Sequence, residues 1–309
     1  MRMERCNGAP VCLIDESIIL SSAEEERLKH SFTIRYVSPS ETDLTKFKQC
    51  DAFLVHSYFP HALLAALQRC KYIGVRAHNA DYVPVHVLPD PLTVIANIPP
   101  VAQQSVAEHV LAMMFYLSKQ LGLARDHTLA GQWRNELKPG MELYGRKLGI
   151  IGNGEIGQAV ARLGTMLGMD VLAADKQGRT TPGGYPLEQV LREADIISLH
   201  LPARQENANF IDRQRIQMMK KGAVLINTAR GSILDYDALE EAMLSGHLRG
   251  VGLDVYPTEP LRTPLARFLS LPNVICTPHT AYYTDRTMER MNRHLIDRAI
   301  HYFDSLIDG

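Results

Sequence analysis

The 309-residue sequence contains no apolar run near the roughly 20 residues that a membrane-spanning helix needs. Its most apolar stretch, VAEHVLAMMFYL, is interrupted by Glu108 and His109, and the N-terminus MRMERCNGAP lacks the apolar core of a signal peptide. The five cysteines are scattered and form no Cys-x-x-Cys pair, which argues against a disulfide framework or a zinc site. The formal net charge of -1 gives no overall attraction to nucleic acid or to an anionic membrane. We therefore expect a reduced, cytoplasmic protein with no metal, no membrane partner and no nucleic-acid partner.

Short apolar runs alternate with helical patterns along the chain. Such alternation predicts parallel sheets covered by helices on both faces, and this length favours two domains. The first series of strands is expected at 11–15, 32–37, 51–57, 71–77 and 92–97, with a helix at 61–69. After a long amphipathic helix at 105–121, the second series is expected at 147–152, 170–175, 194–202, 222–231, 250–256 and 273–278. Six strands with intervening helices predict a doubly wound nucleotide-binding domain, and a last helix is expected at 285–307.

A glycine-rich turn stands between the first strand of the second series and the helix that follows it. Gly152-x-Gly154-x-x-Gly157 permits a tight turn, a close approach of backbone to a pyrophosphate, and close packing of helix on strand. The free N–H groups at the helix N-terminus favour phosphate binding. Asp175 ends the next strand, where a carboxylate can accept both ribose hydroxyls of NAD and repel the 2′-phosphate of NADP. The turn therefore predicts an NAD site.

Four polar residues, Arg230, Asp254, Glu259 and His279, follow strands of the second series. Ligands bind outside the carboxyl ends of the strands in such sheets, so we expect these residues to converge near the nicotinamide. Reduction of a 2-oxo acid needs a cation for the carboxylate, a proton for the carbonyl oxygen and a hydride. Arg230 can hold the carboxylate with its planar guanidinium. His279 can exchange a proton near neutral pH, and Glu259 would orient its ring and raise its pKa.

The motifs GNGEIG, LHLP, NTARGSILD, GLDVYPTEP and TPH recur here in the order and spacing of a known family. By these motifs the chain from about residue 70 onward resembles the D-isomer-specific 2-hydroxyacid dehydrogenases. The resemblance implies that Arg230, Glu259 and His279 form the catalytic triad, and that Asp254 orients the nicotinamide carboxamide. The full set of residues predicted to hold NAD is Gly152, Gly154, Glu155, Ile156, Gly157, Asp175, His200, Pro202, Thr228, Ala229 and Asp254.

The resemblance also implies the architecture. We expect two doubly wound parallel-sheet domains of the Rossmann or flavodoxin-like type, separated by a cleft that closes on substrate. Residues 1–98 with 284–309 would form the substrate-binding domain, and 99–283 the NAD-binding domain. The helix at 105–121, which contains SVAEH, builds the dimer interface in this family, so a homodimer is expected.

The substrate is less well specified by the sequence. TPHTAYYT is nearest to the D-lactate dehydrogenase branch, which implies pyruvate or another small 2-oxo acid. The loop VRAHNADYV departs from that branch, because His78 and Asn79 stand where the family has a glycine-containing substrate loop before an aspartate, here Asp81. Asparagine tolerates left-handed backbone, so the loop can keep its shape. The predicted substrate residues are Arg76, His78, Asn79, Arg230 and Tyr283.

Two interpretations of the loop stay open. Arg76 and His78 can form a second cationic feature for a phosphonate-, phosphate- or carboxylate-bearing 2-oxo acid. Alternatively, Arg76 is buried in an interdomain ion pair and His78 only shapes the loop. An alternative of another class is an NAD(H)-sensing interaction protein, similar to the corepressors that resemble this family. Formate and phosphite dehydrogenases are further alternatives on the same scaffold, although the former have a longer N-terminus and the latter favour lysine in this loop.

Overall fold

The computed structural model describes residues 9–78, 83–134, 137–174, 184–202, 205–261 and 267–308. The chain divides into two compact units. Unit 1 contains Met1–Val101 and Asp285–Gly309, and unit 2 contains Ala102–Thr284. Two of the predicted site residues, Asn79 and Asp175, lie outside the described residues, as does the loop aspartate Asp81.

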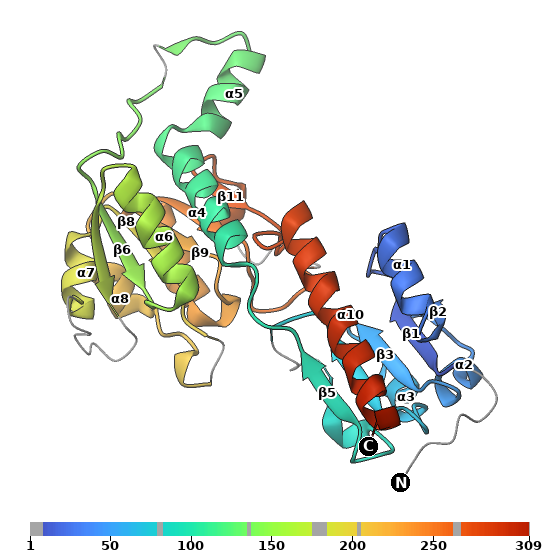
Figure 1. Ribbon diagram of the computed structural model, residues 1–309. Helices are drawn as coiled ribbons and strands as arrows, with labels where there is room; N and C mark the ends of the chain where they lie inside the picture. The colour runs from blue at the N-terminus through green and yellow to red at the C-terminus, as the bar shows by residue number, and fades with distance from the viewer. Residues whose placement is uncertain are drawn as a thin grey trace. The chain divides into compact units, whose positions relative to one another are not determined.

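Unit 1 is built on a five-stranded parallel sheet in the order β2-β1-β3-β4-β5 (Figure 1). This is the strand order of flavodoxin-like folds, in which the order reverses between β1 and β3. Helices α1 and α10 pack together on one face, where α10 contacts β4, and the short helices α2 and α3 pack with each other. The strands are β1 (Val11–Asp15), β2 (Thr33–Val37), β3 (Ala52–Val55), β4 (Tyr72–Val75) and β5 (Val94–Asn97), and the helices are α1 (Ser22–Lys29), α2 (Leu44–Lys48), α3 (His61–Ala65) and α10 (Asp285–Asp308).

The sequence of unit 1 explains these elements. β3 and β4 are buried at every position, and β1 at all but its first, as in strands that are covered on both faces. Helix α1 begins at a capping box, in which the N–H of Ser21 donates to the Glu24 carboxylate and the N–H of Glu24 donates to Ser21 Oγ. Phe47, Phe53 and Phe59 form edge-on or tilted ring contacts in the core of this unit.

Unit 2 is built on a six-stranded parallel sheet in the order β11-β10-β9-β8-β6-β7 (Figure 1). Helices α4 and α6 pack together over one face, and α7, α8 and α9 form the layer on the other. The strands are β6 (Lys147–Ile151), β7 (Asp170–Ala174), β8 (Ile196–Leu199), β9 (Ala223–Asn227), β10 (Leu248–Leu253) and β11 (Val274–Cys276). The helices are α4 (Gln103–Ser118), α5 (Leu121–Leu129), α6 (Glu155–Met166), α7 (Leu187–Glu193), α8 (Arg213–Met218) and α9 (Tyr236–Leu244).

Both sheets confirm the predicted fold class of two doubly wound parallel sheets. Several strands end earlier than their apolar runs suggest. The strand expected at 222–231 ends at Asn227, because the Asn227 side chain accepts from the Ala229 N–H and donates to the Arg230 carbonyl, which turns the chain out of the sheet. Within the described part of the chain, no helix is long and apolar enough to cross a membrane.

Candidate active site

The predicted dinucleotide residues lie at the carboxyl edge of the sheet of unit 2. The strand order reverses between β6 and β8, and the loops that follow these two strands carry the glycine turn and His200. The loops after β9, β10 and β11 carry Arg230, Asp254 and His279 at the same edge. This is the position at which doubly wound sheets bind ligands.

The glycine turn has the backbone geometry that a pyrophosphate cradle requires. Gly152 has a φ of 101°, and a Cβ at this position would lie within 3.0 Å of the His200 carbonyl oxygen. A Cβ on Gly157 would meet the carbonyl oxygen of Gly152, so helix α6 packs against the turn only because residue 157 is glycine. Gly154 is the N-cap of α6, and a Cβ there would point into open space. The first N–H groups of α6 are therefore left to face an anion.

Further residues of the predicted NAD set lie at the start of α6 and in the loop after β8. Glu155 and Ile156 are the first residues of α6, and a hydrogen bond joins Glu155 to Gln103 of α4. Pro202 directs its carbonyl oxygen to the Asn207 side chain. The ring of His200 bonds Ser198 Oγ at 2.9 Å, and burial lowers the pKa of His200 to about 4, so the imidazole is neutral at physiological pH.

Thr228 and Ala229 fit a polar ligand as well. Both are buried in the turn after β9, and Thr228 Oγ1 has no hydrogen-bond partner among the described residues. A buried hydroxyl without a partner is costly, so this atom is suited to a ligand group. Together with the glycine cradle, it shows that the residues at this edge fit a dinucleotide.

Arg230 leaves β9 through a turn that only glycine completes. A Cβ on Gly231 would lie within 3.0 Å of the backbone C and O atoms of Tyr256 and of the Pro257 nitrogen. This contact brings the turn after β9 against the segment that leads to Glu259. The guanidinium of Arg230 is half-buried and donates to the Ala229 carbonyl at 2.7 Å.

His279 and Glu259 are in direct contact. Nδ1 of His279 lies 2.6 Å from Oε2 of Glu259, and the other carboxylate oxygen accepts from the Tyr256 N–H at 2.8 Å. Burial favours the protonated carboxyl. The hydrogen bonds from His279 and the Tyr256 N–H, and the charges of His279 and Arg230, outweigh it and lower the pKa of Glu259. The contact leaves Nε2 of His279 as the ring nitrogen that can exchange a proton with a substrate.

Asp254 holds the loop that carries His279 through several hydrogen bonds. The side chain is fully buried, and it accepts from Thr277 Oγ1, from the Thr280 N–H at 2.8 Å and from the Ala281 N–H at 2.9 Å. Its backbone carbonyl accepts from the His279 N–H at 2.8 Å. The predicted contact of Asp254 with the nicotinamide remains a prediction, while both of its carboxylate oxygens bond the loop that carries His279.

The predicted substrate residues have different surroundings. In unit 2, the ring of Tyr282 stands edge-on to His279 at 5.8 Å between centroids, while Tyr283 is 55% exposed. In unit 1, Arg76 is buried and donates to Asn292 Oδ1 of α10 and to the Ser17 carbonyl. His78 is exposed, and its carbonyl accepts from the Asn97 side chain. The hydrogen bonds to Asn292 and Ser17 hold the guanidinium of Arg76 within unit 1, and the interdomain ion pair considered for it remains a prediction.

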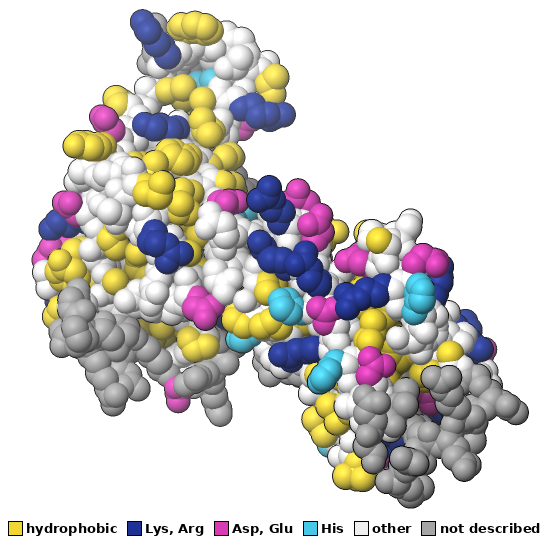
Figure 2. Space-filling model, viewed as in Figure 1, with side chains coloured by type: hydrophobic (Ala, Val, Ile, Leu, Met, Phe, Trp, Pro, Cys, Tyr) yellow, Lys and Arg dark blue, Asp and Glu magenta, His cyan; other side chains and the backbone are white. Residues whose placement is uncertain are grey.

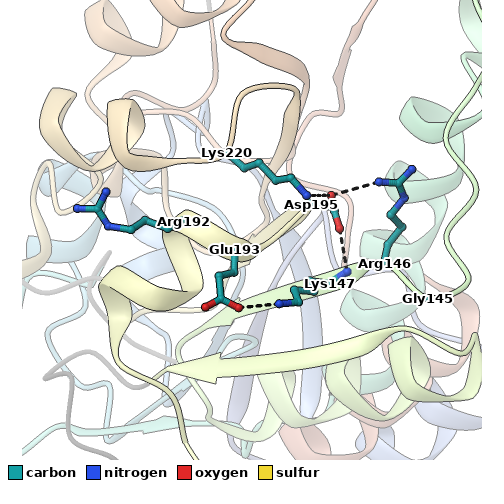
Figure 3. A pocket seen from close by; sticks show the side chains of 7 residues that line it. All are labelled: Gly145, Arg146, Lys147, Arg192, Glu193, Asp195 and Lys220. Carbon is teal, nitrogen blue, oxygen red and sulfur yellow. Dashed lines mark hydrogen bonds and ion pairs between the residues drawn. The ribbon is translucent and has the colours of Figure 1, made fainter.

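A pocket of about 510 Å³ lies at the opposite edge of the same sheet (Figure 3). Its charged side chains largely pair with one another. Lys147 contacts Glu193 at 2.6 Å, and Lys220 contacts Asp195 at 2.6 Å. These ion pairs tie together the starts of β6, β8 and β9, so we assign the pocket a structural role. Its lining residues are Gly145, Arg146, Lys147, Arg192, Glu193, Asp195 and Lys220.

Several residues that shape the site were not identified from the sequence. Asn227 turns the chain toward Arg230, and Thr277, Ser105 and His109 bond the loop around His279. The spacing of Ser105 and His109, one helical turn apart in SVAEH, was a usable signal, because it places both side chains on one face of a helix. Among the described residues, no group of three or more His, Cys, Asp or Glu side chains could hold a metal ion.

Comparison with known proteins adds to this geometry. A family model described as "D-isomer specific 2-hydroxyacid dehydrogenase, NAD binding domain" matches residues 111–281. Hydroxypyruvate reductase of Thermotoga maritima is 33% identical over 240 residues, which cover 76% of this chain and 78% of that protein. D-3-phosphoglycerate dehydrogenase of Mycobacterium leprae is 33% identical over 91% of this chain, which spans 54% of that protein. The crystal structure of D-lactate dehydrogenase from Aquifex aeolicus, complexed with NAD and lactic acid, has a TM-score of 0.79 and 29% identity, with 96% of each chain covered.

Proposed function

Because the chain belongs to the family of D-isomer specific 2-hydroxyacid dehydrogenases, we propose that it reduces a small 2-oxo acid to the D-2-hydroxy acid. Family membership confirms the predicted resemblance, the NAD-binding domain and the class of NAD-dependent oxidoreductase. The identity of the acid and the roles of individual residues are proposals. The observation that best supports the proposed reaction is the contact between His279 and Glu259, since it pairs a proton donor with a carboxylate at the coenzyme edge of the sheet.

His279 supplies the proton. In the imidazolium form, Nδ1–H donates to the Glu259 carboxylate, and Nε2–H donates its proton to the carbonyl oxygen of the substrate. As the carbonyl carbon becomes tetrahedral, its oxygen takes this proton and becomes the hydroxyl of the product. Glu259 favours the charged ring before transfer and keeps the ring oriented afterward. In the reverse direction the neutral ring accepts the proton of the hydroxyl.

Arg230 binds the substrate carboxylate. Its guanidinium can form two parallel hydrogen bonds to the two carboxylate oxygens, which fixes the position of the adjacent carbonyl carbon. The same positive charge polarises the carbonyl toward hydride attack. The hydrogen bond of this guanidinium to the Ala229 carbonyl is a local contact that leaves other N–H groups for an anion.

Bound NADH supplies the hydride. The chain would hold it with the turn from Gly152 to Gly157 at the pyrophosphate, and with Thr228 Oγ1 as a polar contact near the β9 turn. Asp175, outside the described residues, is proposed to bind the ribose hydroxyls and to favour NAD over NADP.

The nature of the substrate depends on unit 1 as well. Arg76 already bonds Asn292 and Ser17 within that unit, so the second cationic feature, if a substrate uses one, is the exposed His78. This arrangement supports a small monoanionic 2-oxo acid over a dianionic one.

NADH oxidation against a panel of acids tests the proposal. The panel contains pyruvate, glyoxylate, hydroxypyruvate, branched and aromatic 2-oxo acids, and phosphonopyruvate as the dianionic member. We expect turnover with a small monoanionic acid and its loss, by a factor of about 10² or more, in His279→Ala. Fluorescence titration should show unchanged NADH affinity in that variant. An inactive wild-type protein that binds NADH would reject the enzyme and support the interaction-protein alternative.

We also propose that the protein forms a homodimer through α4 and α5. Figure 2 shows hydrophobic side chains gathered over the part of unit 2 where these helices lie. A contiguous exposed apolar surface marks a candidate protein interface. Phe115 of α4, Leu121 and Leu129 of α5, and Trp133 just after α5 are exposed apolar side chains of this segment. Light scattering on the purified protein should give twice the monomer mass, and a monomer at micromolar concentration would reject this assembly.

A further inference from the structure

Two side chains on one face of α4 hold the loop that carries His279. Ser105 Oγ donates to the Ala281 carbonyl at 2.7 Å, and His109 Nε2 lies 3.0 Å from Thr277 Oγ1. Ser105 and His109 are four residues apart, so both point from the same side of the helix. Their partners lie on either side of His279, so α4 contacts the loop at both of its ends.

The direction of these hydrogen bonds can be assigned. The Thr277 hydroxyl has one proton, and it donates that proton to Asp254 Oδ1. Oγ1 must therefore accept from His109, so Nε2 of His109 carries a hydrogen. The result is a chain of bonds from His109 through Thr277 to Asp254. Asp254 in turn accepts from the backbone N–H groups of Thr280 and Ala281.

The loop needs such support because His279 has an unfavourable backbone conformation. Its φ is 55°, in the left-handed region that is unfavourable for a non-glycine residue and persists only when its surroundings enforce it. Asp254 supplies several of the enforcing bonds, and Ser105 and His109 supply the contacts that come from a helix. In this conformation Nδ1 of His279 lies 2.6 Å from Oε2 of Glu259.

We infer that Ser105 and His109 are positioning residues that fix the backbone of the His279 loop, and through it the orientation of the proton-donating ring. This inference rests on the proposed function for its catalytic consequence, whereas the restraint on the loop stands on the contacts alone. Neither residue touches the reacting atoms in this assignment. SVAEH then has a role within one chain, in addition to any role that α4 has between chains.

The inference is tested with two substitutions and two matched controls. His109→Ala and Ser105→Ala remove the contacts to the loop. Ser118→Ala removes a buried hydroxyl of the same helix that donates to the Phe115 carbonyl within α4, and His247→Ala removes a half-buried histidine that bonds Ile216 in another part of unit 2. His109→Gln serves as the conservative variant, because the glutamine amide can still donate to Thr277 Oγ1.

Steady-state kinetics and hydrogen exchange are measured on each variant. The first is steady-state reduction of the best 2-oxo acid, in which kcat should fall about tenfold or more while KM and NADH affinity change little. His109→Gln should recover most of the lost kcat. The second is hydrogen exchange of the peptide that contains residues 274–284, which should become faster in His109→Ala and Ser105→Ala but not in either control.

The outcomes separate the two proposals. The first outcome is that His279→Ala loses turnover as expected, while His109→Ala and Ser105→Ala keep the wild-type kcat and the wild-type rate of hydrogen exchange. In that case the positioning role is wrong. If no 2-oxo acid is reduced, the proposed function fails, and the exchange experiment still decides whether α4 restrains the loop. Should an α4 variant unfold, Thr277→Val replaces it, because valine keeps the shape of threonine and removes the hydroxyl that links His109 to Asp254.

Discussion

Nδ1 of His279 lies 2.6 Å from Oε2 of Glu259, although the two residues are 20 positions apart. The pairing of β10 with β11 produces this contact, because the loops after parallel neighbours leave the sheet at the same edge. The second oxygen of Glu259 is held by the Tyr256 N–H. The carboxylate is therefore fixed at both oxygens, and it fixes the tautomer of the ring.

Glu259→Gln should lower kcat by about 10–10² while NADH binding is unchanged, because the amide can no longer stabilise the imidazolium. The pKa of Glu259 is lowered below 4.5, so the wild-type carboxylate stays ionised until the pH falls through that lowered value. The acid limb of kcat that this protonation produces should be absent in Glu259→Gln. Steady-state rates measured from acidic to neutral pH check both points, and a variant with wild-type kcat would remove Glu259 from the mechanism.

Arg230→Lys should reduce kcat/KM for the 2-oxo acid by about 10² or more, because an ammonium cannot form two parallel bonds to a carboxylate. The charge is kept in this variant, so the test separates geometry from electrostatics. Saturation kinetics and NADH fluorescence titration measure the two affinities. A lysine variant with wild-type kcat/KM would show that only the charge matters.

Gly231→Ala should weaken both folding and catalysis. The added Cβ meets the backbone of Tyr256 and Pro257, which cannot move as a flexible side chain can. Overpacking of this kind costs about 1–3 kcal/mol of the free energy of unfolding. Displacement of the Arg230 turn from the Glu259 segment should lower kcat more than the loss of stability explains. Urea unfolding and kcat on the same sample check this, and unchanged values for both would contradict the close approach.

His200→Gln should make the stability of the protein without coenzyme less dependent on pH. The folded state keeps His200 neutral down to about pH 4, whereas the unfolded chain binds a proton below 6.5. Folding stability therefore falls as the pH drops from 6.5 to 4 and is constant with respect to this group above 6.5. The loss amounts to about 3 kcal/mol over that window. Urea unfolding at several pH values should show a shallower decline in the variant, and equal slopes would contradict the burial of a neutral ring.

Asp175→Ala should reduce the preference for NADH over NADPH, because the residue is proposed to bind the ribose hydroxyls and to repel a 2′-phosphate. The ratio of kcat/KM for the two coenzymes measures this preference. Asp170→Ala, an exposed carboxylate at the start of β7, is a suitable control. An unchanged ratio in Asp175→Ala would assign coenzyme choice to other residues.

The sequence predicted the sheets well because their strands are buried on both faces, and burial on both faces leaves continuous apolar runs such as AFLV and AVLIN. It did not predict α1, because within Ser22–Lys29 only Leu28 is buried and the helix shows no apolar periodicity. The available signal for α1 was its capping box, Ser21 and Glu24.

Part of the geometry around His279 was also expected from the sequence, while the roles of the site residues stay predictions. Residues that end strands could be placed at one edge from the alternation alone, which is why His279 and Glu259 were expected together. The bonds of Asp254 to Thr280 and Ala281 depend on side-chain directions in a loop, and those are not encoded in any periodicity. The burial of Arg76 against Asn292 joins residues 216 positions apart, and a single sequence gives no indication of such a contact.

The left-handed backbone of His279 has a practical consequence for trapping bound substrate. Asparagine adopts this conformation more readily than most residues, whereas alanine favours right-handed or extended backbone. His279→Asn should therefore preserve the shape of the loop while removing the exchangeable ring proton. Crystals of that variant, soaked with coenzyme and a 2-oxo acid together, offer a direct route to an unreacted ternary complex.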